Sequence, residues 1–175
     1  MDTRKGVQVA LLLAIGFILH YITPPILFGM KPDFLLVMMF IALILNRGNY
    51  RLAVLTGLLG GILSAITSTF PGGQIANIID KLLTAHCAYL MIKFLPTSLS
   101  KIVSAEIVAV IGTLLSGVFF LTAAALIVGL PGSFIALFLA VVLPATLINA
   151  IAIAILQPAV QMGQQAVSHP TSKQV

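Results

Sequence analysis

Charged side chains are scarce in this sequence. Aspartate, glutamate, lysine and arginine together make up 7% of the 175 residues, whereas a soluble domain usually has about 25%. Hydrophobic residues make up 60%, and the mean hydropathy is +1.17. This composition excludes an ordinary soluble domain and predicts a polytopic membrane protein built as one bundle in contact with lipid. The net charge of +5 is spread between apolar segments and forms no basic patch, so it does not indicate a nucleic-acid partner.

Several chemical motifs are also missing. A single cysteine, Cys87, excludes an intrachain disulfide, and the three histidines are too scattered along the chain for a metal site. The sequence has no phosphate-binding GxxxxGK[ST] motif and no recognisable set of nucleophile, base and orienting residue. We therefore expect no enzyme activity, no cofactor and no bound metal, and we interpret the chain as a protein that moves a substrate.

Six apolar segments can be marked along the chain. They are separated by short stretches rich in proline, glycine and polar residues, which are typical of turns, and they cover roughly 6–27, 30–46, 52–70, 74–95, 102–128 and 134–157. The sequence thus predicts an all-α fold, a polytopic bundle of six transmembrane helices over residues 1–158. A short polar tail follows over 159–175. Because six is an even number, both termini lie on one side of the membrane.

The distribution of basic residues predicts which side that is. Cytoplasmic loops carry an excess of lysine and arginine. Seven basic residues share a side with the N-terminus and two do not: the seven are Arg4, Lys5, Arg47, Arg51, Lys93, Lys101 and Lys173, and the two are Lys31 and Lys81. We expect both termini, and the polar tail, to be cytoplasmic.

Four charged residues fall at unusual depth in this arrangement. Counting ~1.5 Å per helical residue from the inner edge, Asp33 lies roughly 21 Å above Arg47, and Asp80 roughly 20 Å from Lys93. Lys31 and Lys81 lie at similar depth, within the outer half of a hydrocarbon core ~30 Å thick. Charges at such depth usually face a cavity or a partner. We therefore expect these four residues to face inward together.

The fourth segment shows which face of its helix points inward. Gln74, Asn77, Lys81 and Thr84 recur at helical spacing, and Asp80 flanks the face that they form. On the sixth segment Asn149 falls at comparable depth. Lys31, Asp33, Asp80 and Lys81 sum to zero charge, which suits a neutral or zwitterionic ligand, because lysine binds a carboxylate and aspartate an ammonium group.

A purely structural interpretation of these charges stays open. Lys31 with Asp80, or Asp33 with Lys81, would form interhelical ion pairs that only fix the bundle. Glu106 lies near the inner membrane interface, and His20 at the outer end of the first helix is expected to be a structural histidine.

Small residues recur at spacings typical of close helix contacts. The third segment has Ala53, Gly57, Gly61 and Ala65, each four residues apart, and we expect this face to pack inside the bundle. The first segment has Gly6, Ala10 and Ala14 at the same spacing. For that face, an internal contact and a docking surface for another protein remain alternatives.

Two motifs carry a family resemblance. Gly29-Met30-Lys31-Pro32-Asp33, before the second segment, and the stretch from Phe70 to Lys81 (FPGGQIANIIDK) together resemble the bacterial tryptophan-transporter family. That family is grouped with the substrate-binding S-components of energy-coupling-factor vitamin transporters. The resemblance covers essentially the whole chain. It implies an S-component-like fold of six helices and uptake of L-tryptophan across the bacterial cytoplasmic membrane.

The resemblance also implies where the ligand and a partner bind. In S-components the ligand sits near the outer face under the loop that joins the first two helices, here the stretch from Pro24 to Pro32, which we expect to be the gate. S-components dock on a transmembrane coupling subunit, which works with ATPases, through an Ala-x-x-x-Ala face that Ala10 and Ala14 match. Whether this chain uses such a module or works alone stays open.

The residues of this predicted site have the following expected roles. Lys31 or Lys81 binds the substrate carboxylate, and Asp33 or Asp80 binds its ammonium group. The amides of Gln74, Asn77 and Asn149 bind the ligand or hold these charges, and Asn149 or Gln74 accepts the indole N–H. Phe28, Met30, Phe34 and Phe70 offer apolar surface for the indole. Gly73, in the loop beside Phe70, is also expected at the substrate site. The alternatives are an S-component for another neutral aromatic compound or vitamin precursor, and a structural membrane protein with a buried ion-pair network.

Overall fold

A computed structural model of the chain describes residues 3–25 and 28–168, and in these ranges every regular element is helical. The elements are α1 (Thr3–Ile22), α2 (Phe34–Leu45), α3 (Tyr50–Ile66), α4 (Gly73–Phe94), α5 (Lys101–Ile127), α6 (Phe134–Leu137), the π-helical turn η1 (Phe138–Val142) and α7 (Leu143–Ser168). Since α6, η1 and α7 follow one another without a break, they form one long rod. The expected all-helical fold is confirmed.

Local sequence chemistry explains where these helices begin. Asp33, Asn49, Ser100 and Ser133 each precede a helix, and each side chain accepts a hydrogen bond from a backbone N–H of the first turn. Such N-caps satisfy backbone donors that have no partner within the helix. Gly72, before α4, has a left-handed backbone with a φ of 70°, which glycine adopts without steric cost.

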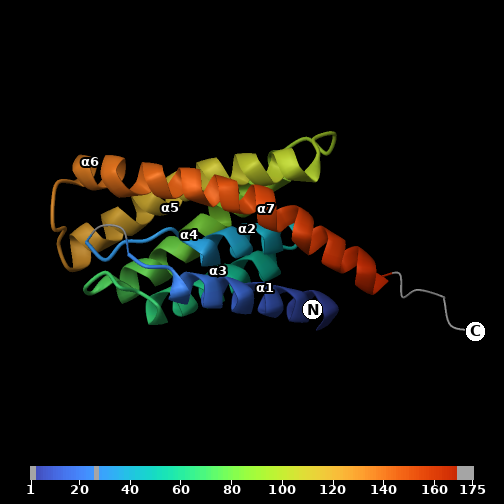
Figure 1. Ribbon diagram of the computed structural model, residues 1–175, viewed down its shortest axis with the longest axis horizontal. Helices are drawn as coiled ribbons and strands as arrows, with labels where there is room; N and C mark the ends of the chain where they lie inside the picture. The colour runs from blue at the N-terminus through green and yellow to red at the C-terminus, as the bar shows by residue number, and fades with distance from the viewer. Residues whose placement is uncertain (1–2, 26–27, 169–175) are drawn as a thin grey trace, which may run out of the picture.

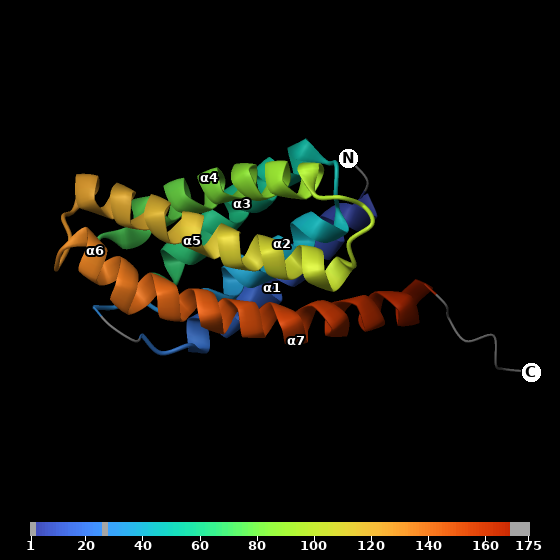
Figure 2. The same cartoon turned by 90° about the horizontal axis from the view of Figure 1, so that it is seen from above.

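The helices form an elongated bundle in which α1 begins and α7 ends at the same end (Figure 1). The connections between α2 and α3 and between α4 and α5 lie at that end too. The loops that precede α2, α4 and α6 lie at the opposite end, and the view turned by 90° shows the same arrangement (Figure 2). Hence the chain passes back and forth along the bundle, as alternating membrane helices do.

Helix α2 lies in the centre of the bundle. It is apolar all round, and its residues from Leu35 to Leu43 are buried against α1, α3, α4, α5 and α7. A helix that is hydrophobic on every side belongs in a core. Its 12 residues rise only ~18 Å, less than the ~30 Å thickness of a hydrocarbon core.

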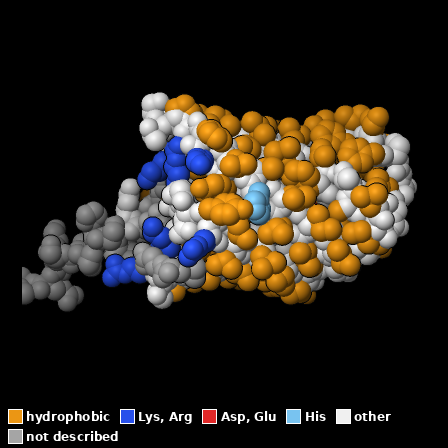
Figure 3. All heavy atoms as spheres, turned by 180° about the vertical axis from the view of Figure 1, so that it is seen from behind, with side chains coloured by type: hydrophobic (Ala, Val, Ile, Leu, Met, Phe, Trp, Pro, Cys, Tyr) orange, Lys and Arg blue, Asp and Glu red, His pale blue; other side chains and the backbone are white. Residues whose placement is uncertain are grey.

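Four helical stretches of the described chain are long and apolar enough to cross a membrane, and α2 and α3 are shorter apolar helices. The four stretches are Thr3–Ile22, Gly73–Phe94, Lys101–Ile127 and Phe134–Gln165. The outer surface of the bundle is largely apolar, and its lysine and arginine side chains gather near the end where α7 finishes (Figure 3). Exposed basic residues there are Arg4, Lys5, Arg47, Arg51, Lys93 and Lys101. We call this end the basic end.

The last helix differs from its expected length. It continues through Pro158 to Ser168, beyond residue 157, where the sixth apolar segment of the sequence ends. The lost backbone hydrogen bond at a proline kinks a helix but need not end it. The first part of the predicted polar tail is therefore helical, and residues 169–175 lie outside the described chain.

The two faces of small residues have different surroundings. Gly57 lies against α4, where an added Cβ would come within 2.5 Å of the Ala85 Cβ, and a Cβ on Gly61 would lie 2.9 Å from the Ile78 Cα. This close contact between α3 and α4 confirms the expected internal packing of the third segment. On α1, by contrast, Ala10 and Ala14 are exposed, and the helix packs inward through Val9, Leu12, Leu13, Gly16 and His20.

Candidate functional site

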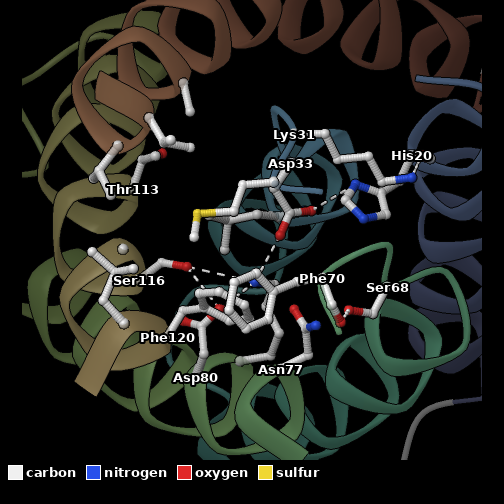
Figure 4. Close-up of a pocket in the computed structure, with 18 of the residues that line it drawn as sticks. His20, Lys31, Asp33, Ser68, Phe70, Asn77, Asp80, Thr113, Ser116 and Phe120 are labelled. Carbon is white, nitrogen blue, oxygen red and sulfur yellow. Dashed lines mark hydrogen bonds and ion pairs between the residues drawn. The ribbon is translucent and has the colours of Figure 1, made fainter. Parts of the chain in front are cut away.

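A cavity of about 100 Å³ lies inside the half of the bundle away from the basic end. Its lining comes from α1, α2 and the loop before it, the loop before α4, and the helices α4, α5 and α7 with the turn η1. Charged and polar residues on this lining are His20, Lys31, Asp33, Ser68, Thr69, Asn77, Asp80, Lys81, Thr113, Ser116 and Asn149. Segments distant in the sequence thus place their polar residues around one space (Figure 4).

The buried Lys81 organises the charges of this cavity. Its Nζ lies 2.7 Å from Asp33 Oδ2, also pairs with Asp80 Oδ2, and lies 3.5 Å from Ser116 Oγ. Lys81 is 2% exposed, and an ammonium has three protons to donate. All three therefore have an acceptor from the protein. We call Asp33, Asp80 and Lys81 the buried triad.

Asp80 is fully engaged by the protein. Thr84 Oγ1 donates to Asp80 Oδ1 at 2.9 Å, while Ser116 Oγ donates to Asp80 Oδ2 at 2.9 Å, beside the pair with Lys81. The side chain is 1% exposed. Through these bonds the Asp80 carboxylate fixes the Lys81 side chain and joins α4 to Ser116 of α5. Such bonding is typical of a residue with a structural role.

Asp33 is less completely engaged. One oxygen pairs with Lys81, and the other accepts a hydrogen bond from the Leu36 N–H at 2.9 Å, which caps α2. His20 Nδ1 lies 3.4 Å from that second oxygen. Figure 4 shows Asp33 between His20 and Asp80, beside Lys31. Asp33 thus links α1, α2 and α4 at the wall of the cavity.

Lys31 bonds outside the buried triad. Its Nζ donates to the backbone oxygen of His20 at 2.6 Å, and the residue is half-buried on the cavity lining. Of the two ion pairs expected from the sequence, the structure forms Asp33 with Lys81. Instead of pairing with Asp80, the Lys31 ammonium donates to the His20 carbonyl and lies within the field of Asp33. The buried triad has a net charge of −1, and Lys31 brings the whole set to zero.

Asn149 has an unusual environment for an amide. It is completely buried on α7, and its Nδ2 donates to Thr113 Oγ1 at 3.3 Å. Its Oδ1 has no hydrogen-bond partner among the described residues, although Asn149 lines the cavity. Buried polar atoms in native proteins are nearly always paired. This acceptor can therefore take a hydrogen bond from an N–H or O–H group of water or of a ligand.

Aromatic and apolar surface closes the cavity on the side of the loops. Phe70 and Phe120 stack edge to face, with ring centroids 5.5 Å apart, and Met30 lies on the same lining (Figure 4 shows both rings). Thr69 Oγ1 donates to the Gly29 carbonyl, which joins the loop before α2 to the loop before α4. Gly29 has a φ of 78°, and an added Cβ would lie 2.3 Å from the Thr69 carbonyl oxygen. Only glycine fits this approach.

The remaining residues expected at the site lie elsewhere. Gln74 is exposed at the start of α4, while Gly73 is buried there against Ser68 and Phe70. Phe28 is 52% exposed and lines an outer groove, and Phe34 packs against the core. The cavity lining in the described chain includes none of these four. The Asn77 side chain does line the cavity, and its Nδ2 donates to the Gly73 carbonyl at 2.9 Å.

Sequence reasoning missed the contribution of α5 and of His20. Thr113, Ser116 and Phe120 recur at helical spacing on α5, and all three line the cavity. Hydroxyl residues are common in membrane helices, so this spacing alone is a weak signal. His20 falls at the outer end of the first segment, at the same predicted depth as Lys31 and Asp33. That common depth could have placed His20 at the site.

The apolar exterior, the long apolar helices and the charged residues that line an internal cavity are the features of a helical membrane protein. Comparison with known families is specific. The profile of the family described as tryptophan transporter TrpP matches residues 2–164. The chain belongs to this tryptophan transporter family, which confirms the resemblance seen in the two motifs. Because the family consists of transporters, the chain is not an enzyme.

Relatives named as probable tryptophan transport proteins cover nearly the same length. One from Clostridium acetobutylicum is 45% identical over 167 residues, which cover 95% of this chain and 97% of the relative. One from Bacillus subtilis is 48% identical over 161 residues, covering 92% of each chain. A third, from Clostridium perfringens, is 43% identical over 164 residues, covering 86% of this chain and 90% of the relative. No solved structure matches the chain.

Proposed function

We propose that this protein takes up L-tryptophan across the bacterial cytoplasmic membrane, with the cavity as its substrate site. The unpaired Asn149 Oδ1 inside a cavity whose charged groups sum to zero carries this proposal. Tryptophan is a zwitterion with one additional N–H on an apolar ring system, so it matches both features. The basic end then faces the cytoplasm, as the positive-inside rule requires, and the six helical rods cross the membrane with both termini inside.

The bonding of the charged residues supports definite roles. Asp80 already accepts bonds from Thr84, Ser116 and Lys81, so it holds Lys81 and does not meet the ligand. Asp33 binds the ammonium group, because the net −1 charge of the buried triad attracts a cation. Lys31 binds the carboxylate by leaving the His20 carbonyl. These charge-assisted bonds hold the two ends of the zwitterion.

The indole then lies between α5, α7 and the two loops. Its N–H donates to Asn149 Oδ1, and Phe70, Phe120 and Met30 contact its faces. The cavity of about 100 Å³ is smaller than the ~150 Å³ that holds a benzene molecule in an engineered protein cavity. The loops that meet at Gly29 and Thr69 must therefore separate to admit tryptophan. Residues 26 and 27 of the expected gate lie outside the described chain.

Tryptophan binding to the purified protein tests the proposal. The informative ligand pair is tryptophan and its analogue with sulfur in place of the indole N–H. Because a buried hydrogen-bond group left unpaired costs about 1–3 kcal/mol, we expect tryptophan to bind roughly 5–150-fold more tightly than the analogue. The variant Asn149→Leu should reduce this ratio to near one.

A control variant separates this effect from general damage to α7. Thr146→Val changes a buried residue one turn away, whose hydroxyl donates to the Val142 carbonyl and which is not on the cavity lining. It should keep the full preference for tryptophan. If tryptophan fails to bind while another neutral aromatic compound or vitamin precursor binds, the substrate assignment is wrong. If no small molecule binds, the charges serve only as a structural ion-pair network.

The exposed face of α1 supports a partner as in S-components. Ala10 and Ala14 leave a shallow stripe between the exposed Leu11, Ile15 and Ile18, which allows close approach of another helix. We propose that a transmembrane coupling subunit with its ATPases docks there. Ala10→Leu together with Ala14→Leu should abolish co-purification of that subunit and leave tryptophan binding intact. Uptake in vesicles without any ATPase would contradict the coupled form.

A further inference from the structure

A second buried amide lies on α7 beyond the cavity. The Gln157 side chain is completely buried, and both its Nε2 and its Oε1 have no hydrogen-bond partner among the described residues. A membrane helix gains nothing from such a side chain in this conformation, because leucine would fill the space without an unpaired donor and acceptor. Gln157 therefore indicates another conformation in which water or a ligand reaches it.

Other polar residues extend from the cavity toward the basic end. One face of α7 carries a residue at every fourth position. Three of these residues are polar, Asn149, Gln157 and Gln161, and the apolar Ile153 lies between the first two. Gln157 lies ~12 Å from Asn149 toward the basic end. Nε2 of Gln161 and Oδ1 of Asn46, the residue that ends α2, are also buried and without a partner among the described residues. Unpaired polar atoms thus recur along α7 and at the end of α2.

Apolar side chains of the core lie between Asn149 and Gln157. The Phe40 ring of α2 packs on α5 at Gly112, where an added Cβ would lie 2.5 Å from Phe40 Cζ. Gly112 directly precedes Thr113, the partner of Asn149, so this ring lies immediately below the cavity. Ile153 of α7 is completely buried at the next level of the same face. Phe40 and Ile153 both belong to the buried apolar core that separates the cavity from Gln157.

Helix α7 has two points at which it can bend. The π-helical turn Phe138–Val142 precedes it, and Pro158 interrupts its hydrogen bonding directly after Gln157. Proline and π-helical turns are the usual sites of kinks in membrane helices. The stretch between them carries Asn149, Ile153 and Gln157. Beyond Pro158 the helix continues past the neighbouring loops of the bundle (Figures 1 and 2).

We propose that tryptophan leaves the cavity through the seam between α2, α5 and α7, along Asn149 and Gln157 to the basic end. This inference rests on the proposed uptake function. The seam opens when α7 bends at the π-helical turn and at Pro158, which moves Ile153 away from Phe40. Water and the zwitterion then pair with the amides of Gln157 and Asn46. Transport by this route needs no release of the substrate back through the outer loops.

Cysteine accessibility tests the route in the intact protein. The chain has one cysteine, Cys87, so Cys87→Ala gives a background without thiols. In that background Gln157→Cys should react with a charged, membrane-impermeant maleimide added to the cytoplasmic face of inside-out vesicles. A ligand that favours a minor state populated at a few per cent raises its share several-fold. Adding tryptophan should therefore speed labelling about tenfold.

Ile155→Cys provides a control at the same depth. Ile155 is 66% exposed on the outer surface of α7, where lipid surrounds it and a charged reagent has no access. It should stay unlabelled with and without tryptophan. If tryptophan binds and is taken up while Gln157→Cys stays unlabelled under every condition, the proposed route is wrong. If tryptophan does not bind at all, the proposed function fails instead.

A second variant separates a role in the route from a role in folding. Gln157→Leu removes both unpaired atoms and keeps the volume. A residue needed for the folded bundle would lower the unfolding temperature when replaced. We expect the opposite: an unchanged or higher unfolding temperature, tryptophan affinity within about twofold, and uptake slowed by about tenfold, the size of one lost hydrogen bond. Uptake at the wild-type rate would overturn the proposal.

Discussion

The buried triad makes the sharpest prediction about stability. Lys81→Met leaves the buried Asp80 and the half-buried Asp33 without a cation between them, and it removes the contacts of Lys81 Nζ with Asp33, Asp80 and Ser116. Removing one partner of a buried ion pair typically costs 3–5 kcal/mol, because the remaining charge stays buried. We expect the free energy of unfolding to fall by about that amount.

The two aspartates should respond differently. Asp80→Asn leaves Asp33 with Lys81 as a neutral pair and keeps an amide oxygen for Thr84 or Ser116. It should cost about 1–2 kcal/mol, the value of one or two hydrogen bonds. Asp33→Asn removes the cap of α2 and one partner of Lys81, and under the proposed roles it also removes the ammonium site. Tryptophan affinity should fall by tenfold or more in Asp33→Asn and change by only a few-fold in Asp80→Asn.

Thermal unfolding of the purified protein in detergent measures the stability effects. For a chain of this size 1 kcal/mol corresponds to ~2–4 °C, so Lys81→Met should lower the unfolding temperature by roughly 6–20 °C. The double variant Lys81→Met with Asp80→Leu should recover part of that loss, because an apolar pair replaces an unpaired charge. Glu106→Gln, a half-buried residue off the cavity lining, should stay near the wild-type value. Full stability of Lys81→Met would refute this account of the buried triad.

Two further predictions concern glycines. Gly29→Ala should reduce tryptophan uptake at least tenfold, because its Cβ would lie 2.3 Å from the Thr69 carbonyl oxygen and would push the two loops apart. The matched control is Gly48→Ala, which is also at positive φ but has open space around its Cβ. Equal uptake by the two variants would contradict this prediction. Gly57→Ala should destabilise the bundle by about 1–3 kcal/mol, because its Cβ would meet Ala85 at 2.5 Å. Gly60→Ala, with its nearest contact at 3.4 Å to Met39 Sδ, should be close to neutral, and equal unfolding temperatures for these two variants would disprove the close contact of α3 and α4.

The sequence by itself determined the class of the protein and the depth of its charges. Apolar segments of transmembrane length leave a helical bundle as the only way to satisfy the backbone in lipid. The helical rise then placed Lys31, Asp33, Asp80 and Lys81 at one level. The two motifs around these residues were specific enough to indicate the family. Each of these conclusions depends on local periodicity or on neighbouring residues, which a sequence displays directly.

Only the tertiary structure decided which of these residues meet. Packing sets the rotation and tilt of each helix. It turned Gln74 of α4 outward and brought Thr113 and Ser116 of α5 to the cavity. The polar residues of both helices recur at helical spacing, so the spacing alone did not distinguish them. The pairing of Asp33 with Lys81, and the separate bond of Lys31 to the His20 backbone, depend on loop conformation at Gly29, where α2 and α4 come together. The side-chain atoms of Asn149 and Gln157 that lack a hydrogen-bond partner can be identified only from the positions of the surrounding residues. Hydrogen-bond partners are properties of packed surfaces, and no spacing along the chain specifies them.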